Sequence, residues 1–332
     1  MDRHVGKNLS TLEPITIGTE CSGIEAPIIA LRRMGVNHQH LYSTECNESA
    51  RVWSVYNYSP LSRHDDVTKR EARTLPSVDL YVCGIPCQDF SMMNQKRSDT
   101  NVKCESVAMS VLEGIAASLP SSFVIENVPS FRKHKLFNII HDALSREYDM
   151  FSKILSPHEY GSPQNRKRLY LVGIRRGYAV SEFVWPQTVP LGMSCMDVIS
   201  KDLTPDSLES CKVRDKYYSR TLAEWDIDKV PSIVSLSTYA FHPRISENSD
   251  ISPCILASHP GLYAPHLERL LHPKELLALQ GFCGVIIPPS LSNSIVRHLT
   301  GNSMSVDVLM HLFVPILKCI GKTFDPAFAS VK

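Results

Sequence analysis

The amino-acid sequence predicts an α/β protein with a doubly wound, mostly parallel sheet and a smaller, loop-rich region. Strand-like and helix-like segments alternate through the first half of the 332-residue chain, as in sheets that helices cover on both faces. After about residue 176 this regularity fades and prolines become frequent. The length suffices for one sizeable domain and one smaller domain.

The alternating segments begin at residue 15. We expect strands at Ile15–Glu20, His40–Thr44, Val78–Cys83, Ser122–Glu126, Phe151–Leu155 and Arg168–Ile174. We expect helices at Ala26–Met34, Cys104–Ala117 and Lys135–Leu144. The first of these has Pro27 in its first turn and Gly35 just past its end, where these residues are favoured.

Three regions follow from this pattern. We expect the α/β domain at residues 1–176 and a small, loop-rich region at 177–265. Residues 266–332 should return to the first domain, because periodic apolar spacing reappears at Pro273–Leu279 and Val306–Leu317.

The composition, with 43% hydrophobic and 21% charged residues, is that of an ordinary globular protein. No apolar run approaches the roughly 18 residues of a membrane span, and Met1 to Ser10 lack the apolar core of a signal peptide. We therefore expect an intracellular protein with no membrane partner, nuclear in a eukaryote and cytoplasmic in a prokaryote. The ten cysteines include no Cys-x-x-Cys pair, and no His-Glu-x-x-His accompanies them, which argues against a metal site.

The charge is unevenly distributed. The formal net charge is +1, yet residues 130–178 carry ten Lys and Arg against four Asp and Glu. Such a segment is either a local footprint for phosphates or a solvated face, and charge alone does not distinguish the two.

The first predicted strand ends in the loop Cys21-Ser22-Gly23-Ile24-Glu25, which opens a helix. The backbone N–H groups of such a loop suit a ligand with a carboxylate or phosphate. Glu45 follows the second strand, where an acid can bind ribose hydroxyls, and Asp66 follows later. These features indicate a nucleoside-binding pocket. They do not separate NAD from S-adenosylmethionine, although the missing Gly-x-Gly-x-x-Gly counts against a dinucleotide.

The chemistry is predicted at the ends of two later strands. Gly84-Ile85-Pro86-Cys87-Gln88 follows a buried strand, and a cysteine there can be a nucleophile if nearby cations favour its thiolate. Glu126 ends a neighbouring apolar strand. Arg166 and Arg168 are two residues apart and therefore lie on one side of an extended chain. A structural cysteine and a simple Glu126–Arg168 ion pair are the alternatives.

Over nearly its whole length, from Ile15 to about Leu317, the chain resembles the C5-cytosine DNA methyltransferase family. The matches, in family order, are Cys21-Ser22-Gly23-Ile24, Glu45, Asp66-Val67, Gly84 to Ser91, Glu126-Asn127-Val128, Gln164 to Arg168, Leu279 to Phe282 and Gly301 to Ser303. The resemblance implies the Rossmann-like fold of class I S-adenosylmethionine-dependent methyltransferases. It also implies double-stranded DNA as the partner, and we expect a monomer. Residues 1–176 would be the catalytic, cofactor-binding domain, and residues 177–265 the target-recognition region, most variable at about 177–235.

The resemblance further implies a role for each motif. Cys87 would add to C6 of a cytosine flipped out of the duplex, and Glu126 would contact its N3 and N4 edge. Arg166 and Arg168 would favour the thiolate and orient the base. C5 would then take the methyl group of S-adenosylmethionine, and loss of the C5 proton with elimination of Cys87 would restore the ring.

Two further sets of residues follow from the resemblance. The implied cofactor pocket comprises Cys21, Ser22, Gly23, Ile24, Glu45, Asp66, Val67, Gly84, Pro86 and Asn302. The implied DNA contacts lie in a loop from Gln88 to Asn101 and are Gln88, Ser91, Lys96 and Arg97. The stretch from Leu299 to Ser305 should fold back beside the first loop. Arg269 to Phe282 should be a helix in which Gln280 is structural.

The chain departs from the family pattern in the cofactor loop. Cys21 replaces the usual aromatic residue, Glu25 and Ala26 replace glycines, and Ile85 replaces a proline. These changes concern cofactor affinity and remove no group that the chemistry needs. The alternatives are a tRNA or RNA cytosine-C5 methyltransferase, whose Cys-Phe-Thr signature is absent, a catalytically silent DNA-binding homologue and, last, a nicotinamide-dependent oxidoreductase.

Overall fold

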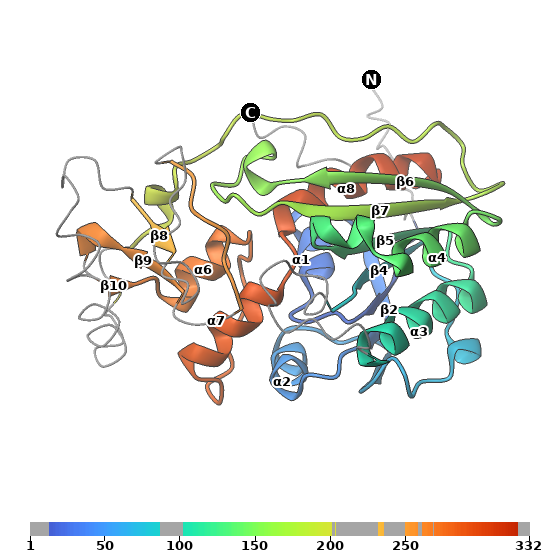
Figure 1. Ribbon diagram of the computed structural model, residues 1–332, viewed down its shortest axis with the longest axis horizontal. Helices are drawn as coiled ribbons and strands as arrows, with labels where there is room; N and C mark the ends of the chain where they lie inside the picture. Colours follow the sequence, from blue (N-terminus) through green and yellow to red (C-terminus); the bar gives the residue numbers. More distant parts are fainter. Residues whose placement is uncertain are drawn as a thin grey trace, which may run out of the picture.

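A seven-stranded sheet forms the centre of the molecule (Figure 1). The computed structural model describes residues 13–86, 102–200, 203, 232–235, 250–257, 261–267 and 269–324. The strands are β1 (Ile15–Glu20), β2 (His38–Thr44), β3 (Ser62–His64), β4 (Leu80–Gly84), β5 (Ser122–Asn127), β6 (Tyr148–Leu155) and β7 (Arg168–Arg175). Their order is β3-β2-β1-β4-β5-β7-β6.

The sheet is mostly parallel. Strands β3, β2, β1, β4 and β5 pair in parallel, and β7 runs antiparallel to both β5 and β6. The strand order reverses between β1 and β4, and ligands of doubly wound sheets bind at the carboxyl ends of strands beside such a reversal. The predicted fold class is confirmed.

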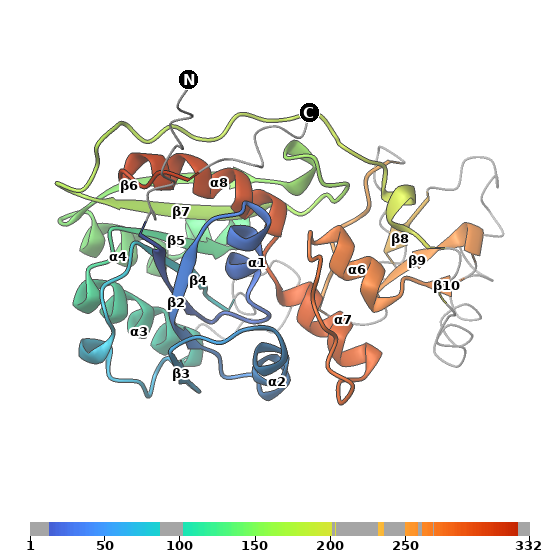
Figure 2. The ribbon, with the colours of Figure 1, turned by 180° about the vertical axis from the view of Figure 1, so that it is seen from behind.

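Helices cover both faces of the sheet (Figures 1 and 2). Helices α1 (Ala26–Arg33) and α8 (Val306–Cys319) pack on one face, and α3 (Val102–Ser118) and α4 (Lys135–Leu144) on the other. Side chains alternate accordingly along β4, where Leu80 and Val82 join the first core and Tyr81 and Cys83 the second. Helix α8 packs against α1, so this part of the C-terminal segment lies on the main sheet.

A smaller group of elements lies beside the sheet (Figure 1). It contains β8 (Val234–Ser235), β9 (Leu262–Ala264), β10 (Arg269–Leu270) and α6 (Pro273–Leu279), with a core of its own that includes Cys195, Ile255 and Leu276. Helix α7 (Asn293–Asn302) contacts both α6 and α2 (Glu48–Asn57), and so connects the small group to the main sheet.

The predicted helix at Arg269–Phe282 is wrong in its extent. Its first residues form strand β10, and the helix begins at Pro273, where the side chains of His272 and Glu275 form a reciprocal cap. The sequence pattern also predicts neither β3 nor α7. Strand β3 is three polar residues long, and its pairing with β2 rather than its composition makes it a strand.

Candidate functional site

Two of the four predicted catalytic residues, Glu126 and Arg168, lie together at one edge of the sheet. Gly84 at the end of β4 lies beside Glu126 near the end of β5, and Tyr170 of β7 pairs with Glu126 on the other side. The Asn127 side chain donates a hydrogen bond to the Ile85 carbonyl at 3.2 Å and so fixes the chain that leads to Pro86. Cys87, Gln88, Ser91, Lys96 and Arg97 lie outside the described residues.

Glu126 is a buried carboxyl group with a cation beside it. It is 8% exposed, and Arg168 Nε lies 3.3 Å from its Oε1. Burial raises the pKa of Glu126 above its usual value, and the positive charges of Arg168 and Arg166 limit that rise. The side chain therefore stays protonated to a higher pH than an ordinary glutamate does.

Arg166 points away from this pair and binds backbone instead. It is 3% exposed, and its terminal nitrogens donate to the carbonyls of Ile255 at 2.7 Å, Gly301 at 2.9 Å and Ser303 at 2.7 Å. The two arginines therefore have different surroundings, although their spacing suggests one shared role. Arg166 joins the start of β7 to two segments that are distant in sequence.

The sequence reasoning missed Cys254. Its Sγ lies 3.6 Å from Arg166 Nη1 and 4.0 Å from Arg168 Nη2. Burial acts to raise the pKa of the Cys254 thiol, but the positive charges of Arg166 and Arg168 prevail and hold it below its usual value. No motif marks this cysteine, because it follows the irregular region whose structure the sequence pattern does not predict.

The predicted cofactor loop lies at the carboxyl ends of β1 and β2. Gly23 has a φ of 55°, and its N–H donates to Glu45 Oε2 at 2.7 Å. Glu45 Oε1 accepts the Asn47 N–H at 2.7 Å. A carboxylate has further lone pairs, so Glu45 can also accept from ribose hydroxyls. These residues fit a nucleoside cofactor.

Three chain segments meet beside Gly84. A Cβ at this glycine would lie 2.9 Å from Met304 Cε and 3.4 Å from the carbonyl oxygen of Cys21. The stretch that contains Met304 therefore lies next to the first loop, as expected from the sequence. A side chain at position 84 would occupy the space between these segments.

The remaining predicted cofactor residues have ordered surroundings. Asp66 Oδ1 accepts the Thr68 N–H at 2.9 Å, and Val67 is buried in the sheet core. The Asn302 side-chain amide lies 3.0 Å from His298 Nε2, and His298 Nδ1 lies 3.0 Å from the Ala257 carbonyl. An imidazole protonated at Nδ1 satisfies both contacts, so His298 orients Asn302, which the motifs alone did not indicate.

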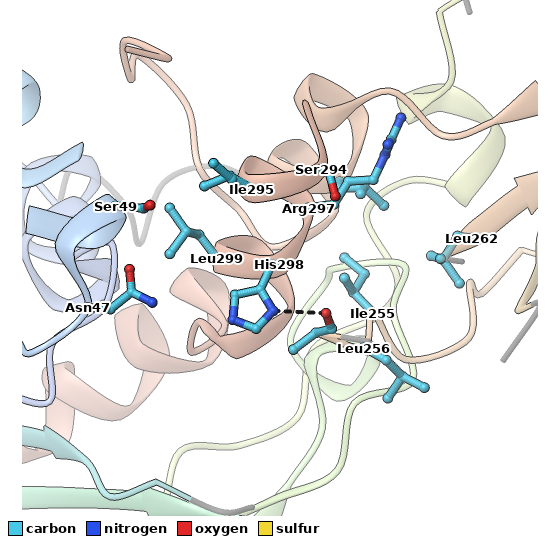
Figure 3. Close-up of a pocket in the computed structure, with 13 residues that line it drawn as sticks. Asn47, Ser49, Ile255, Leu256, Leu262, Ser294, Ile295, Arg297, His298 and Leu299 are labelled. Atoms are coloured by element: carbon cyan, nitrogen blue, oxygen red, sulfur yellow. Dashed lines mark hydrogen bonds between the residues drawn. The ribbon is translucent and has the colours of Figure 1, made fainter. Parts of the chain in front are cut away.

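A cavity of about 280 Å³ borders this region (Figure 3). It lies between the start of α2, the helix α7 and residues 255–257 and 261–262, and its lining includes Asn47, Ser49, Ile255, Leu262 and His298. Two residues of the lining contact predicted cofactor residues: the Asn47 backbone N–H donates to Glu45, and the His298 imidazole bonds to Asn302.

The described residues contain neither a membrane-spanning helix nor a group of metal ligands. None of the described helices is long and apolar enough to cross a membrane. In the same part of the chain, no three His, Cys, Asp or Glu side chains are grouped so that they could hold a metal ion.

Comparisons with known proteins agree with the resemblance. The sequence profile of the C-5 cytosine-specific DNA methylase family matches residues 20–318. The type II methyltransferase M.Bsp6I of Bacillus sp. (strain RFL6) is 25% identical over 293 residues, covering 84% of this chain and 91% of that protein. The type II methyltransferase M.HaeII of Haemophilus aegyptius is 26% identical over 284 residues, covering 82% and 83%.

A solved structure shows the same fold. The Dnmt2 methyltransferase of S. pombe superposes with a TM-score of 0.69 at 18% identity, covering 92% of this chain and 99% of that chain. The profile match spans the first cofactor loop, the Glu126 and Arg168 motifs and the returning helix α8. The chain therefore belongs to the C-5 cytosine-specific DNA methylase family.

Proposed function

We propose that this protein is a monomeric, S-adenosylmethionine-dependent methyltransferase that acts on C5 of cytosine in double-stranded DNA, with Cys87 as the nucleophile. The observation that carries the proposal is the buried Glu126–Arg168 pair, because Glu126 lies beside Gly84, three residues before Cys87 in the chain. A carboxyl group with a raised pKa at this edge can donate a proton to the pyrimidine while the thiolate adds.

The reaction balances as an addition followed by an elimination. The Cys87 sulfur forms a covalent bond to C6 of a cytosine flipped out of the duplex, and Glu126 forms hydrogen bonds with the N3 and N4 edge of the base. Bound S-adenosylmethionine supplies the methyl group that C5 takes. A base then takes the C5 proton, the Cys87–C6 bond breaks to release the thiolate, and the ring returns its other proton to Glu126. Arg168 holds Glu126 in place, and we assign Arg166 a positioning role because its nitrogens bind carbonyls.

The cofactor pocket is proposed at the ends of β1 and β2. Ser22 to Ile24 and Glu45 would hold the nucleoside, and Asn302, oriented by His298, would close the pocket from the other end of the chain. We assign residues 177–265 to target recognition. The small core that contains Cys195 and Leu262 supports this division.

The test is a trapping experiment with 5-fluorocytosine in duplex DNA. Fluorine at C5 cannot leave as a proton, so the wild-type protein with S-adenosylmethionine should form a covalent complex with a duplex that contains its site. Cys87→Ser should form none and lose methylation by about 10³-fold or more, while its cofactor affinity stays unchanged. Cofactor binding by the wild-type protein without a complex on any duplex would overturn the active-enzyme reading.

Sequencing of DNA and tRNA from cells that express the protein completes the test. Methylated cytosines in DNA would support the proposal and give the recognition sequence. Methylated tRNA together with unmethylated DNA would instead assign the protein to RNA.

A further inference from the structure

We propose that Glu25 is a positioning residue that holds the cofactor loop in its binding shape only while its side chain is a neutral carboxylic acid. The inference rests on the proposed S-adenosylmethionine pocket and deepens it. Position 25 is one of the sites where this chain departs from the glycines of the family. The consequence is that cofactor affinity should depend on pH through this side chain.

The Glu25 side chain connects the loop to two strands. Glu25 precedes helix α1 with a φ of 62° and is 0% exposed. Its Oε1 accepts hydrogen bonds from Ser43 Oγ of β2 at 2.5 Å and from Thr19 Oγ1 of β1 at 3.2 Å. An alanine or glycine at this position could make neither bond.

A short chain of contacts leads from Glu25 to the proposed pocket. Its backbone N–H donates to the Ser22 carbonyl at 2.9 Å, and Ser22 Oγ lies 3.2 Å from Ser43 Oγ. The next residue, Gly23, donates its N–H to Glu45. A movement of Glu25 therefore shifts the backbone that faces the cofactor.

The surroundings of Glu25 do not accommodate a negative charge. Among the described residues, its Oε2 is buried without a hydrogen-bond partner. Burial raises the pKa of Glu25 to about 7, the hydroxyls of Ser43, Ser22 and Thr19 limit the rise, and the charge of Glu45 adds to it.

The neighbouring groups offer little compensation. His40 Nε2 lies 3.0 Å from Thr19 Oγ1, but burial lowers the pKa of His40 to about 4, so the imidazole is neutral. From the segment after α2, the Tyr58 hydroxyl donates to the Ile24 carbonyl at 2.9 Å. Arg32 of α1 stacks on the Tyr58 ring at 5.0 Å, and no described hydrogen bond joins it to Glu25.

The ionisation of Glu25 should weaken the binding of the cofactor. Below pH 7 the carboxylic acid is neutral and keeps the loop tied to Thr19 and Ser43. Above pH 7 the ionised group is fully buried beside Glu45, with hydroxyls on one oxygen and no described hydrogen bond on the other, which favours loop conformations that expose it to water. Cofactor affinity should therefore fall as the pH rises through about 7.

The experiment measures the binding of S-adenosylhomocysteine by calorimetry from pH 5.5 to 8.5 in three variants and the wild type. Wild-type affinity should weaken by about tenfold between pH 6.5 and 8.5. Glu25→Gln, which keeps the acceptor oxygen without the charge, should remove most of that loss. Glu25→Ala should bind more weakly at every pH. Glu147→Gln, at an exposed acid far from the loop, should follow the wild type.

Comparing the variants removes the ligand's own titration, which is the same in every protein. If Glu25→Gln keeps the wild-type pH dependence, or Glu25→Ala binds like the wild type, the inference is overturned.

A second measurement without ligand separates this inference from the proposed function. The thermal midpoint of Glu25→Gln minus that of the wild type should increase between pH 5 and 7 and then level off, because the unfolded wild type releases the Glu25 proton at lower pH than the folded protein does. A flat difference overturns the inference even if the cofactor binds. If the wild type binds no cofactor at any pH, the proposed pocket fails, and a rising stability difference still supports the buried neutral acid.

Discussion

Glu126 is a carboxyl group whose protonation is set by opposing effects. Burial favours the neutral acid, and Arg168 at 3.3 Å favours the carboxylate. Burial prevails, so the pKa of Glu126 is higher than that of an exposed glutamate. In the proposed reaction the neutral acid is the useful form, because it donates to the base.

This gives a prediction for the pH dependence of activity. The kcat/KM of the wild type should fall as the pH rises through the raised pKa of Glu126, because the proton that it donates is lost. Glu126→Gln should lose about 10²- to 10³-fold in kcat and show no such alkaline limb. Methylation rates from pH 5.5 to 9 test this, with Glu147→Gln as the control. An unchanged alkaline limb in Glu126→Gln would assign it to another group.

Individual residues also show where sequence reasoning stops. The sequence places Glu126 at the end of one strand and Arg168 at the start of another. Because β5 and β7 are antiparallel neighbours, these two ends lie at the same edge of the sheet. The division of labour between Arg166 and Arg168 does not follow from strand order, because it depends on which carbonyls approach from residues 255, 301 and 303. Nor does the inward direction of Glu25, which depends on a positive φ and on two hydroxyls from different strands.

At the scale of elements, the start of β7 is joined to both the small region and the C-terminal segment. Arg166 makes that joint through three carbonyls, and Gln280 adds to it by donating to the Thr300 and Ser303 carbonyls at 3.1 Å. Gln280 is buried, which agrees with its predicted structural role. The carbonyls of residues 300, 301 and 303 in the C-terminal segment therefore receive hydrogen bonds from Arg166 before β7 and from Gln280 of the small region.

Removal of the Arg166 side chain should be costly. Arg166→Ala removes the arginine donor from three buried carbonyls, of which that of Ser303 keeps its bond from Gln280, and should reduce the free energy of unfolding by about 3 kcal/mol. The free energy of unfolding of Arg166→Lys should lie between those of the wild type and Arg166→Ala, because one ammonium group cannot reach all three acceptors. Urea unfolding followed by circular dichroism measures the change. Lys167→Ala, the exposed neighbour, should stay within about 0.5 kcal/mol of the wild type. A decrease in the free energy of unfolding of less than about 1 kcal/mol in Arg166→Ala would contradict the proposed role of Arg166 in joining these segments.

Helix α7 depends on a close backbone approach. A Cβ on Gly301 would lie 2.4 Å from the Ala257 nitrogen and 2.4 Å from the Leu256 carbonyl carbon. Gly301→Ala should therefore push α7 from residues 256–257 and destabilise the protein by about 2 kcal/mol. It should also weaken cofactor binding, because His298 would lose its contact with Ala257. Thermal unfolding and calorimetry report the two effects. Gly192→Ala, whose Cβ meets its nearest atom at 3.4 Å, is the control and should change neither.

At the scale of the whole molecule, the basic segment is split. The formal net charge is +1, and β7 places Arg168 at the site edge and Arg175 at the opposite end of an eight-residue strand. At about 3.3 Å per residue the two ends are roughly 23 Å apart, more than two Debye lengths at physiological salt. The segment is therefore not one continuous footprint. Lys167 and Arg168 lie at the start of β7, and Arg132 and Lys133 follow the end of β5, at the edge that carries the proposed site.

The affinity for duplex DNA should depend on the basic residues at the start of β7 and not on those at the opposite end of the sheet. Lys167→Ala should weaken duplex binding and reduce the slope of log K against log salt by about one, because an exposed cation next to the site is removed. Arg146→Ala, exposed in the turn before β6 at the other end of the sheet, should leave both unchanged. Anisotropy titrations between 50 and 200 mM salt distinguish them. Equal losses in the two variants would mean that DNA contacts both ends.

The sequence by itself determined the alternating α/β order, the strand ends at which chemistry-bearing residues stand and the family to which they belong. These are local properties, since period, turn residues and motif spacing are written along the chain. Only the tertiary structure decided that Arg166 binds carbonyls while Arg168 faces Glu126, that Cys254 joins them, and that Glu25 is enclosed below the cofactor loop. The reason is physical: hydrogen bonds and charge pairs depend on distances between segments that are remote in sequence, and burial sets their strength.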